Sequence, residues 1–237
     1  MIKCSPTKTL FATLVFAAAV AIAPATFAQD ESTQIDVAQI PATGTAARDF
    51  APPDWEVEET TTGDLNGDGT ADLAIKLIEV KPASSDPDAH LDRNRALVIA
   101  LAGAGGKFIR AGVADKVLQC TTCGGAFYGM MDAPANVSIA KGVIIVQQDH
   151  GSRNVTETTY RFRFDPASKR FILIGFDLSD RDRAAGGSTS TSTNFLTGVK
   201  ITTTVPPKGR TRTVRTKVST KKQFIEDVSQ DEMEGEE

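Results

Sequence analysis

The chain has 237 residues, 41% of them hydrophobic and 24% charged, and a formal net charge of −4 at pH 7. This acidic balance argues against a generally basic nucleic-acid-binding protein, and the length is sufficient for one domain with a hydrophobic core. With 3 cysteines and 2 histidines, the chain has few residues for most metal or nucleophile chemistries.

The chain begins with the three-part layout of a secretory signal peptide. Lys3 and Lys8 give a positive start, residues 9–23 form a continuous apolar run, and small residues follow. A membrane anchor is the alternative, but this run is shorter than the roughly 20 residues that span a bilayer. We therefore expect a Sec signal peptide over residues 1–28, cleaved after Ala28, and a periplasmic or secreted protein without stable membrane insertion.

Residues 29–50 are mostly small and polar and have no clear period, which is typical of a flexible leader. A β-rich domain is expected over residues 51–226, with Trp55 in its core. The acidic residues 227–237 are expected to form a disordered tail.

An aspartate-rich loop, GDLNGDGTADLAI, stands directly before an apolar strand. Asp64, Asn66 and Asp68 place oxygen atoms at alternate positions, Thr70 adds its backbone carbonyl, and Asp72 adds a further carboxylate. Calcium takes about six to eight oxygen ligands, and the glycines allow the sharp turn that wraps such ligands around one point. The pattern predicts a calcium site over residues 64–72. The alternative is that NGDG is only a turn sequence.

The loop differs from an EF-hand, because Ile75 stands where the bidentate glutamate would be and the flanking segments look like strands. GDLNGDGTADLAI instead resembles the calcium loop of FG-GAP/VCBS-type repeats, which are familiar from β-propellers. The longer stretch from Asp49 to Gly198, including CTTCGG and YRFRFDPASKRFILIGFD, resembles a group of uncharacterised bacterial exported proteins. The resemblance implies a calcium ion that braces the fold. A propeller needs several blades, so a single loop does not imply a closed propeller.

The apolar runs after the loop are short, rich in β-branched residues and separated by turn sequences. RALVIALAG and KFIRAGV flank a glycine turn, NVSIAKGVIIVQQD turns at Lys141–Gly142, and YRFRF alternates aromatic and polar residues before the turn DPASK. Threonine-rich segments around PPKG predict a last hairpin. We expect an all-β fold with a single antiparallel, twisted meander sheet, partly closed as a barrel or sandwich-like.

Cys120 and Cys123 have the CxxC spacing of a redox motif. In thioredoxin-like proteins such a pair begins a helix, whereas here two glycines follow and strands surround the pair. An oxidising compartment favours a structural disulfide, and a thiol redox role is the alternative. A zinc site would also need His90 and His150, whose spacing fits no common zinc motif.

The sequence DHGS brings Asp149, His150 and Ser152 together. Adjacent residues on a strand point to opposite faces, so Asp149 and His150 are not expected to pair, and a nucleophile elbow is missing. His150 would be the first residue to test for activity.

Every charged residue between positions 200 and 222 is basic. Such a hairpin could meet anionic envelope lipid or polysaccharide, or it could guard a sheet edge against aggregation, which we favour. Nucleic-acid binding is not expected, because aromatic residues are not interleaved. The basic residues are Lys200, Lys208, Arg210, Arg212, Arg215, Lys217, Lys221 and Lys222.

These features predict an exported, non-enzymatic β protein, stabilised by calcium and a disulfide, that binds an envelope or extracellular partner. A periplasmic hydrolase that uses His150 and nearby carboxylates is the alternative.

Overall fold

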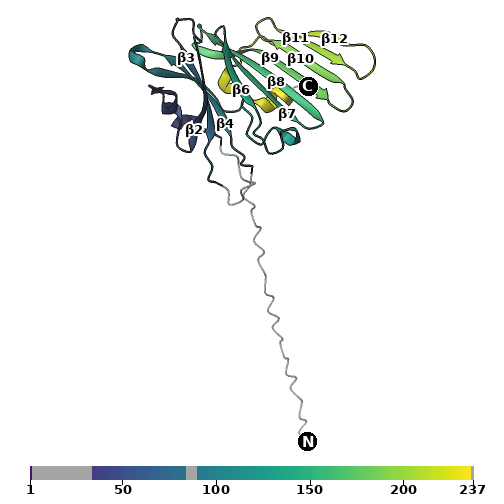
Figure 1. Ribbon diagram of the computed structural model, residues 1–237, viewed down its shortest axis with the longest axis horizontal. Helices are drawn as coiled ribbons and strands as arrows, with labels where there is room; N and C mark the ends of the chain where they lie inside the picture. Colours follow the sequence, from purple (N-terminus) through teal and green to yellow (C-terminus); the bar gives the residue numbers. More distant parts are fainter. Residues whose placement is uncertain (2–33, 84–89, 236–237) are drawn as a thin grey trace. The chain divides into compact units, whose positions relative to one another are not determined.

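The computed structural model describes Met1, residues 34–83 and residues 90–235. The described residues from 34 onward belong to one compact unit, whose strands form two antiparallel sheets (Figure 1). The all-β, antiparallel prediction is confirmed, and one sheet curls into a half-barrel. The strands divide between two sheets, however, and do not form one meander sheet. The expected signal peptide lies outside the described residues, apart from Met1.

The smaller sheet has five strands in the order β1-β5-β4-β3-β2. They are β1 (Thr43–Gly44), β2 (Trp55–Gly63), β3 (Asp72–Glu79), β4 (Arg95–Ala102) and β5 (Phe108–Ala114).

The larger sheet has seven strands in sequence order from β6 to β12, and each strand pairs with the next one in the chain. Lys141 and Gly142 both have positive φ in the two-residue turn of its first hairpin, as the sequence predicts. The strands are β6 (Ala135–Ala140), β7 (Val143–Gly151), β8 (Asn154–Asp165), β9 (Arg170–Asp182), β10 (Ser188–Asn194), β11 (Val199–Val205) and β12 (Arg212–Lys217).

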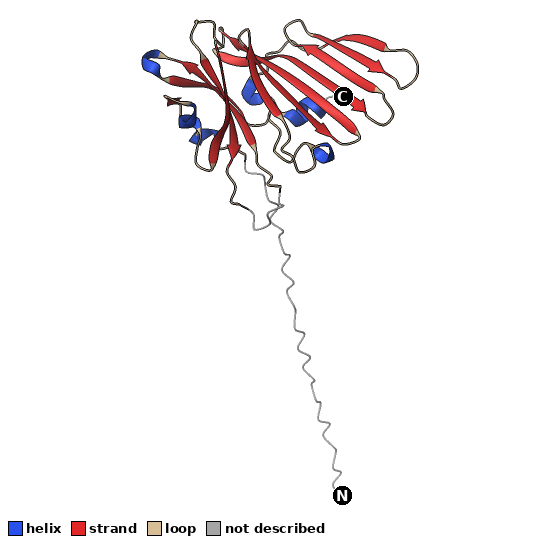
Figure 2. Ribbon diagram, viewed as in Figure 1, coloured by secondary structure: helices blue, strands red, loops and turns tan. Residues whose placement is uncertain are grey.

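Helices are short in the described part of the chain and lie outside the sheets (Figure 2). The one α-helix among them is α1 (Gln230–Gly235). The 3-10 helices are η1 (Val37–Gln39), η2 (Ala47–Phe50), η3 (Ala104–Gly106), η4 (Gly125–Phe127) and η5 (Ile225–Asp227).

The main hydrophobic core joins the two sheets. Leu97 and Ile99 on β4 belong to the same buried cluster as Ile144, Phe162 and Leu173 of the larger sheet. Burial of large apolar side chains supplies most of the driving force for folding. This shared core therefore makes the two sheets one folding unit.

A second core lies on the other face of the smaller sheet. Ile35, Ile40 and Phe50 are buried there against a cluster that includes Ile75 and Val98. The prediction of a flexible leader is therefore wrong for residues 34–50, because their apolar side chains cover this face. With both faces covered, all eight residues of β3 are buried.

The segment after the last strand is also part of the fold. Ile225, Val228 and Met233 belong to the main core, and α1 is present where a disordered tail was expected. The prediction of disorder is wrong for residues 227–235, because Val228 and Met233 within this acidic stretch pack in the main core.

Candidate functional site

The aspartate loop joins β2 to β3 and wraps around Asp64. One carboxylate oxygen of Asp64 accepts a hydrogen bond from the Gly67 amide at 2.7 Å, and the other accepts one from the Gly69 amide at 2.9 Å. Gly67 and Gly69 have φ values of 83° and 84°, which side chains other than glycine rarely adopt. The two glycines therefore permit the turn that the sequence predicts.

Asn66 and Asp68 continue the same pattern along the loop. The Asn66 side-chain oxygen accepts from the Asp68 amide at 2.9 Å, and the Asp68 carboxylate accepts from the Thr70 amide at 2.7 Å. The Asn66 side-chain amide also donates to Asp68 at 2.9 Å. The hydrogen bonds from Asn66 and Thr70 lower the pKa of Asp68, so this exposed carboxylate is ionised at neutral pH.

Asp72 is fully buried and anchors the loop to the sheet. Its carboxylate accepts from the Leu65 amide at 2.8 Å and from the Ala102 amide at 2.7 Å. Leu65 lies in the loop and Ala102 ends β4. Asp72 therefore closes the loop against the neighbouring strand.

The donor types of this loop fit calcium, which prefers carboxylate, amide and carbonyl oxygens. Within residues 34–83 and 90–235, however, no group of three or more His, Cys, Asp or Glu side chains is arranged so that it could hold a metal ion. The loop carboxylates bond instead to amides, and each carboxylate oxygen keeps a further lone pair. The five predicted ligands thus lie in one loop, with Asp72 already committed to two backbone groups.

Cys120 and Cys123 form the predicted disulfide, with their Cα atoms 5.1 Å apart. The pair lies between β5 and β6, and only the three-residue η4 follows it, unlike the longer helix of a thioredoxin-like site. Thr121, between the cysteines, is fully buried; its hydroxyl donates to the Leu91 carbonyl at 2.7 Å and accepts from the Arg93 amide at 2.9 Å. The disulfide loop is therefore fixed to the chain before β4.

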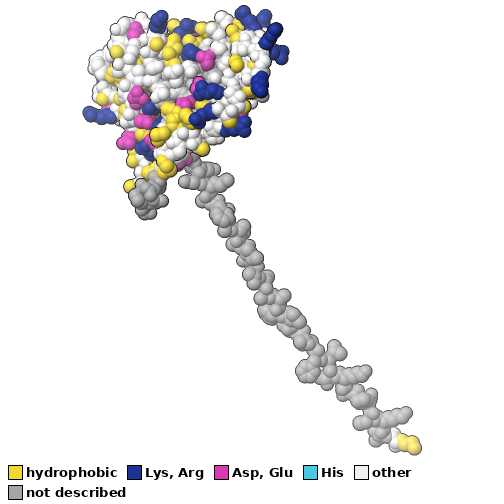
Figure 3. Space-filling model, turned by 45° about the vertical axis from the view of Figure 1, so that its right-hand side comes forward, with side chains coloured by type: hydrophobic (Ala, Val, Ile, Leu, Met, Phe, Trp, Pro, Cys, Tyr) yellow, Lys and Arg dark blue, Asp and Glu magenta, His cyan; other side chains and the backbone are white. Residues whose placement is uncertain are grey.

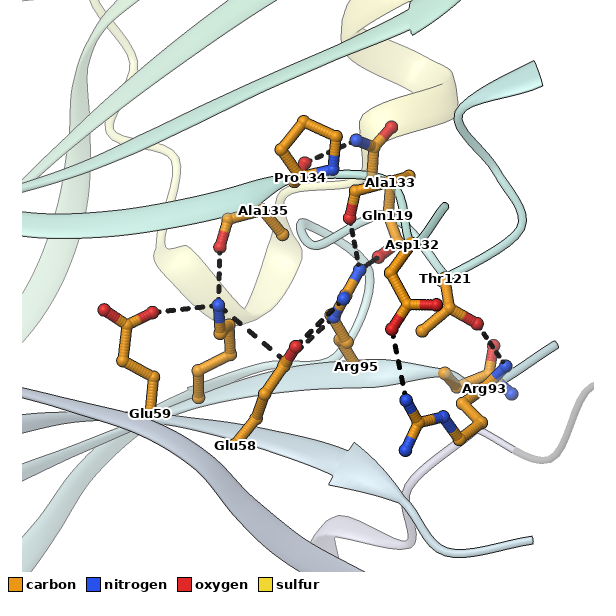
Figure 4. Close-up of polar contacts among 12 residues, drawn as sticks. Glu58, Glu59, Arg93, Arg95, Gln119, Thr121, Asp132, Ala133, Pro134 and Ala135 are labelled. Atoms are coloured by element: carbon orange, nitrogen blue, oxygen red, sulfur yellow. Dashed lines mark hydrogen bonds and ion pairs between the residues drawn. The ribbon is translucent and has the colours of Figure 1, made fainter. Parts of the chain in front are cut away.

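An ion-pair network around two buried basic side chains, Arg95 and Lys76, lies close to this loop and was not predicted (Figure 4). The side chain of Arg95 is 3% exposed and binds both carboxylate oxygens of Glu58, at 2.8 and 2.9 Å. It also donates to the carbonyls of Gln119 and Ala133. Arg95 therefore joins β2 and β4 to the segments on either side of the disulfide loop.

Lys76 extends the network toward the larger sheet. Its ammonium group lies 2.9 Å from Glu59 and 3.8 Å from Glu58, and it donates to the Ala135 carbonyl of β6 at 3.0 Å. One basic residue in each apolar strand, within DLAIKLIE and at the start of RALVIALA, was the sequence signal for this network. Because its charges are paired and bonded to backbone groups, we assign it a structural role.

Asp149 and His150 face away from each other, as the strand geometry predicts. Asp149 accepts from the Tyr128 hydroxyl at 2.6 Å, and burial together with this bond raises the pKa of Tyr128 to about 12. The Nε2 atom of His150 lies 3.4 Å from a carboxylate oxygen of Glu234, which comes from α1. Burial raises the pKa of Glu234, while the His150 charge opposes that shift.

The other ring nitrogen of His150, Nδ1, is buried and has no hydrogen-bond partner in the described part of the chain. A catalytic triad requires a nucleophile bonded to the histidine, and no hydroxyl or thiol bonded to His150 is found among the described residues. His150 thus has a carboxylate neighbour, Glu234, which the sequence pattern did not indicate.

The basic hairpin predicted near the C-terminal end forms β11 and β12. All six residues of β12 are exposed, and this strand lies at one edge of the larger sheet. Of its eight basic side chains only Lys222 forms an ion pair within the described residues, at 2.7 Å from Asp165. Figure 3 shows Lys and Arg side chains gathered along one side of the molecule.

Searches of the chain against protein-family models, curated proteins and solved structures find no match. No helix among the described residues is long and apolar enough to cross a membrane.

Proposed function

We propose that the protein is an exported, non-enzymatic β protein that binds an envelope or extracellular partner. A calcium ion at residues 64–72 and the Cys120–Cys123 disulfide brace its fold. The signal-like start of the sequence and the disulfide support export to an oxidising compartment.

The arrangement of the aspartate loop carries the calcium part of the proposal. Asp64, Asn66 and Asp68 supply side-chain oxygens, Thr70 supplies a carbonyl, and Asp72 supplies a buried carboxylate that is already held in place. Calcium would replace amide hydrogen bonds of the loop and neutralise carboxylates that otherwise repel one another. Its role would be to fix the loop between β2 and β3.

The melting temperature of the purified protein, with calcium and with chelator, tests this role. We expect weak affinity, with a Kd of about 10⁻⁴–10⁻³ M, as is typical of extracellular modules. Calcium at ten times its Kd stabilises a fold by about 1.4 kcal/mol. For a chain of this size that energy corresponds to a rise in melting temperature of about 3–6 °C.

Asp68→Ala should abolish the calcium-dependent rise, whereas Glu232→Ala, which removes an exposed carboxylate of α1, should keep it. Equal melting temperatures of the wild-type protein with and without calcium would contradict the calcium site and mean that the loop is only a turn.

A periplasmic hydrolase is the second candidate, because His150 lies beside Glu234 and has an unpartnered nitrogen. A set of chromogenic esters and phosphate esters tests this candidate. Turnover that is lost in His150→Gln and Glu234→Gln would support it, and no turnover above the buffer rate would reject it.

A further inference from the structure

A cavity of about 550 Å³ lies between the larger sheet and the C-terminal segment of residues 218–233. Its volume lies within the range of about 300–1,000 Å³ that is usual for small-ligand sites. The Val218 amide donates to the Gly198 carbonyl at 3.0 Å, and the Leu173 amide donates to the Gln223 carbonyl at 2.9 Å. The segment is thus attached to the sheet at two separate points, after β10 and at β9.

One part of the cavity is apolar. Phe176 and Leu178 come from β9 and are 4% and 5% exposed, and Met233 of α1 is 8% exposed. Phe195, after β10, also lines the cavity and is half-buried. These side chains offer a surface for a hydrocarbon chain.

Two threonines also line the cavity. Thr191 and Thr193 on β10 are 5% and 7% exposed, and neither hydroxyl bonds to another residue in the described part of the chain. Neither hydroxyl oxygen is fully buried, so both can reach the space of the cavity. A hydroxyl can donate and accept hydrogen bonds, so both are available to a polar group bound there.

The register of three strands places an apolar, a hydroxyl and a positively charged side chain in one row. Phe176 on β9 lies opposite Thr193 on β10, which in turn lies opposite Lys200 on β11. All three line the cavity. The row therefore changes from apolar to positively charged over two strand spacings.

Lysines dominate the charged part of the lining. Lys200, Lys221 and Lys222 line the cavity, and Asp227 is the one acidic residue beside them. Lys222 is paired with Asp165, but the side chains of Lys200 and Lys221 form no ion pair or hydrogen bond with any described residue. The cavity thus has positive charge that the fold itself does not neutralise.

We propose that this cavity binds an anionic amphiphile with a single apolar chain. The chain packs against Phe176, Leu178 and Met233, and a carboxylate or phosphate head group meets Lys200 and Lys221, with Thr193 donating a hydrogen bond. This inference names a ligand class for the proposed binding role and does not depend on the calcium site.

Isothermal titration calorimetry of the purified full chain tests the proposal with four probes, each at concentrations where it is monomeric in solution. They are decanoate, decyl phosphate, 1-decanol and butyrate. We expect saturable binding of one decanoate or decyl phosphate per chain, and the tighter of the two identifies the head group. Decanol lacks the charge and butyrate lacks the chain, so both should bind at least about tenfold more weakly, since charge-assisted bonds and apolar burial both contribute.

The double variant Lys200→Gln/Lys221→Gln should weaken decanoate binding by about tenfold. The matched control Lys208→Gln/Arg210→Gln removes two charges from the same basic hairpin outside the cavity, and should leave binding unchanged. Thr193→Val keeps the shape of the side chain and should weaken binding by about threefold through loss of one hydrogen bond.

An absence of saturable binding by both anionic probes would overturn the proposal. Equal weakening in the two double variants would overturn it as well, because binding would then follow the whole basic edge. Asp68→Ala should bind decanoate as the wild type does. Failure of the calcium proposal and failure of the cavity proposal are therefore measured separately.

Discussion

At the scale of single residues, Arg95 shows how a charge can be buried in this fold. Its guanidinium group is satisfied by one carboxylate and two backbone carbonyls, drawn from three separate parts of the chain. Such a pair contributes little net stability by itself, but removing one partner leaves a buried charge without compensation.

Glu58→Ala should therefore destabilise the protein by about 3 kcal/mol, as measured by urea denaturation. Glu56→Ala, an exposed carboxylate on the same strand, is the matched control and should change stability by less than about 0.5 kcal/mol. Adding Arg95→Met to Glu58→Ala should restore part of the loss, because it removes the unpaired charge. Equal stability in the two single variants would contradict this role.

The ionised carboxylate of Asp165 makes the stability of the folded protein depend on pH in the acid range. Hydrogen bonds from Lys222 and Ser168 hold its pKa at about 2, compared with an ordinary value of 3.8. Because the folded state favours the ionised form, this stabilisation is present above pH 3.8 and is lost as the pH falls toward 2.

Asp165→Asn should thus lower stability at neutral pH and reduce the change in stability between pH 4 and 2, as followed by urea denaturation at each pH. Asp54→Asn changes an exposed aspartate whose side chain has no partner within residues 34–83 and 90–235, and should retain the wild-type profile. A wild-type profile in Asp165→Asn would show that the bond to Lys222 does not persist in solution.

At the scale of elements, the C-terminal segment holds the larger sheet to the smaller one. Ile225 in η5 is fully buried and lies so close to β5 that a Cβ atom on Gly112 would be 3.2 Å from it. A segment that looks disordered by composition therefore fills space between two sheets.

Ile225→Ala should destabilise the protein by about 2–5 kcal/mol, because it leaves a cavity in a packed core. Leu196→Ala removes an apolar side chain that is 47% exposed and should cost much less. Thermal denaturation of both variants measures the difference. Similar small losses would mean that this segment is not docked in solution.

The strands themselves were predictable because their signals are local. The alternation around Tyr160 and the turns at Lys141 and Lys169 are confirmed by β8, β9 and the hairpin of β6 and β7, since positive φ occurs at both lysines. The division into two sheets was not predictable, because hairpin signals do not show which hairpins belong to the same sheet. The roles of Ile35 and Met233 depend on tertiary contacts that a single sequence does not reveal.

At the scale of the whole molecule, the candidate sites are spread over both sheets. The aspartate loop connects strands of the smaller sheet, whereas His150 and the cavity lie on the larger one. The predicted disulfide is confirmed, and the calcium role of the five loop residues stays a prediction. It did not indicate Glu234 beside His150 or the lysine-lined cavity, because both depend on where the C-terminal segment docks.

The most direct test of the central claim is a count of calcium ions bound by the purified protein, made by isothermal titration calorimetry. The account predicts one ion per chain with a Kd of about 10⁻⁴–10⁻³ M, and no binding in Asp68→Ala. An absence of binding by the wild type, or equal binding by the variant, would contradict a calcium site at residues 64–72.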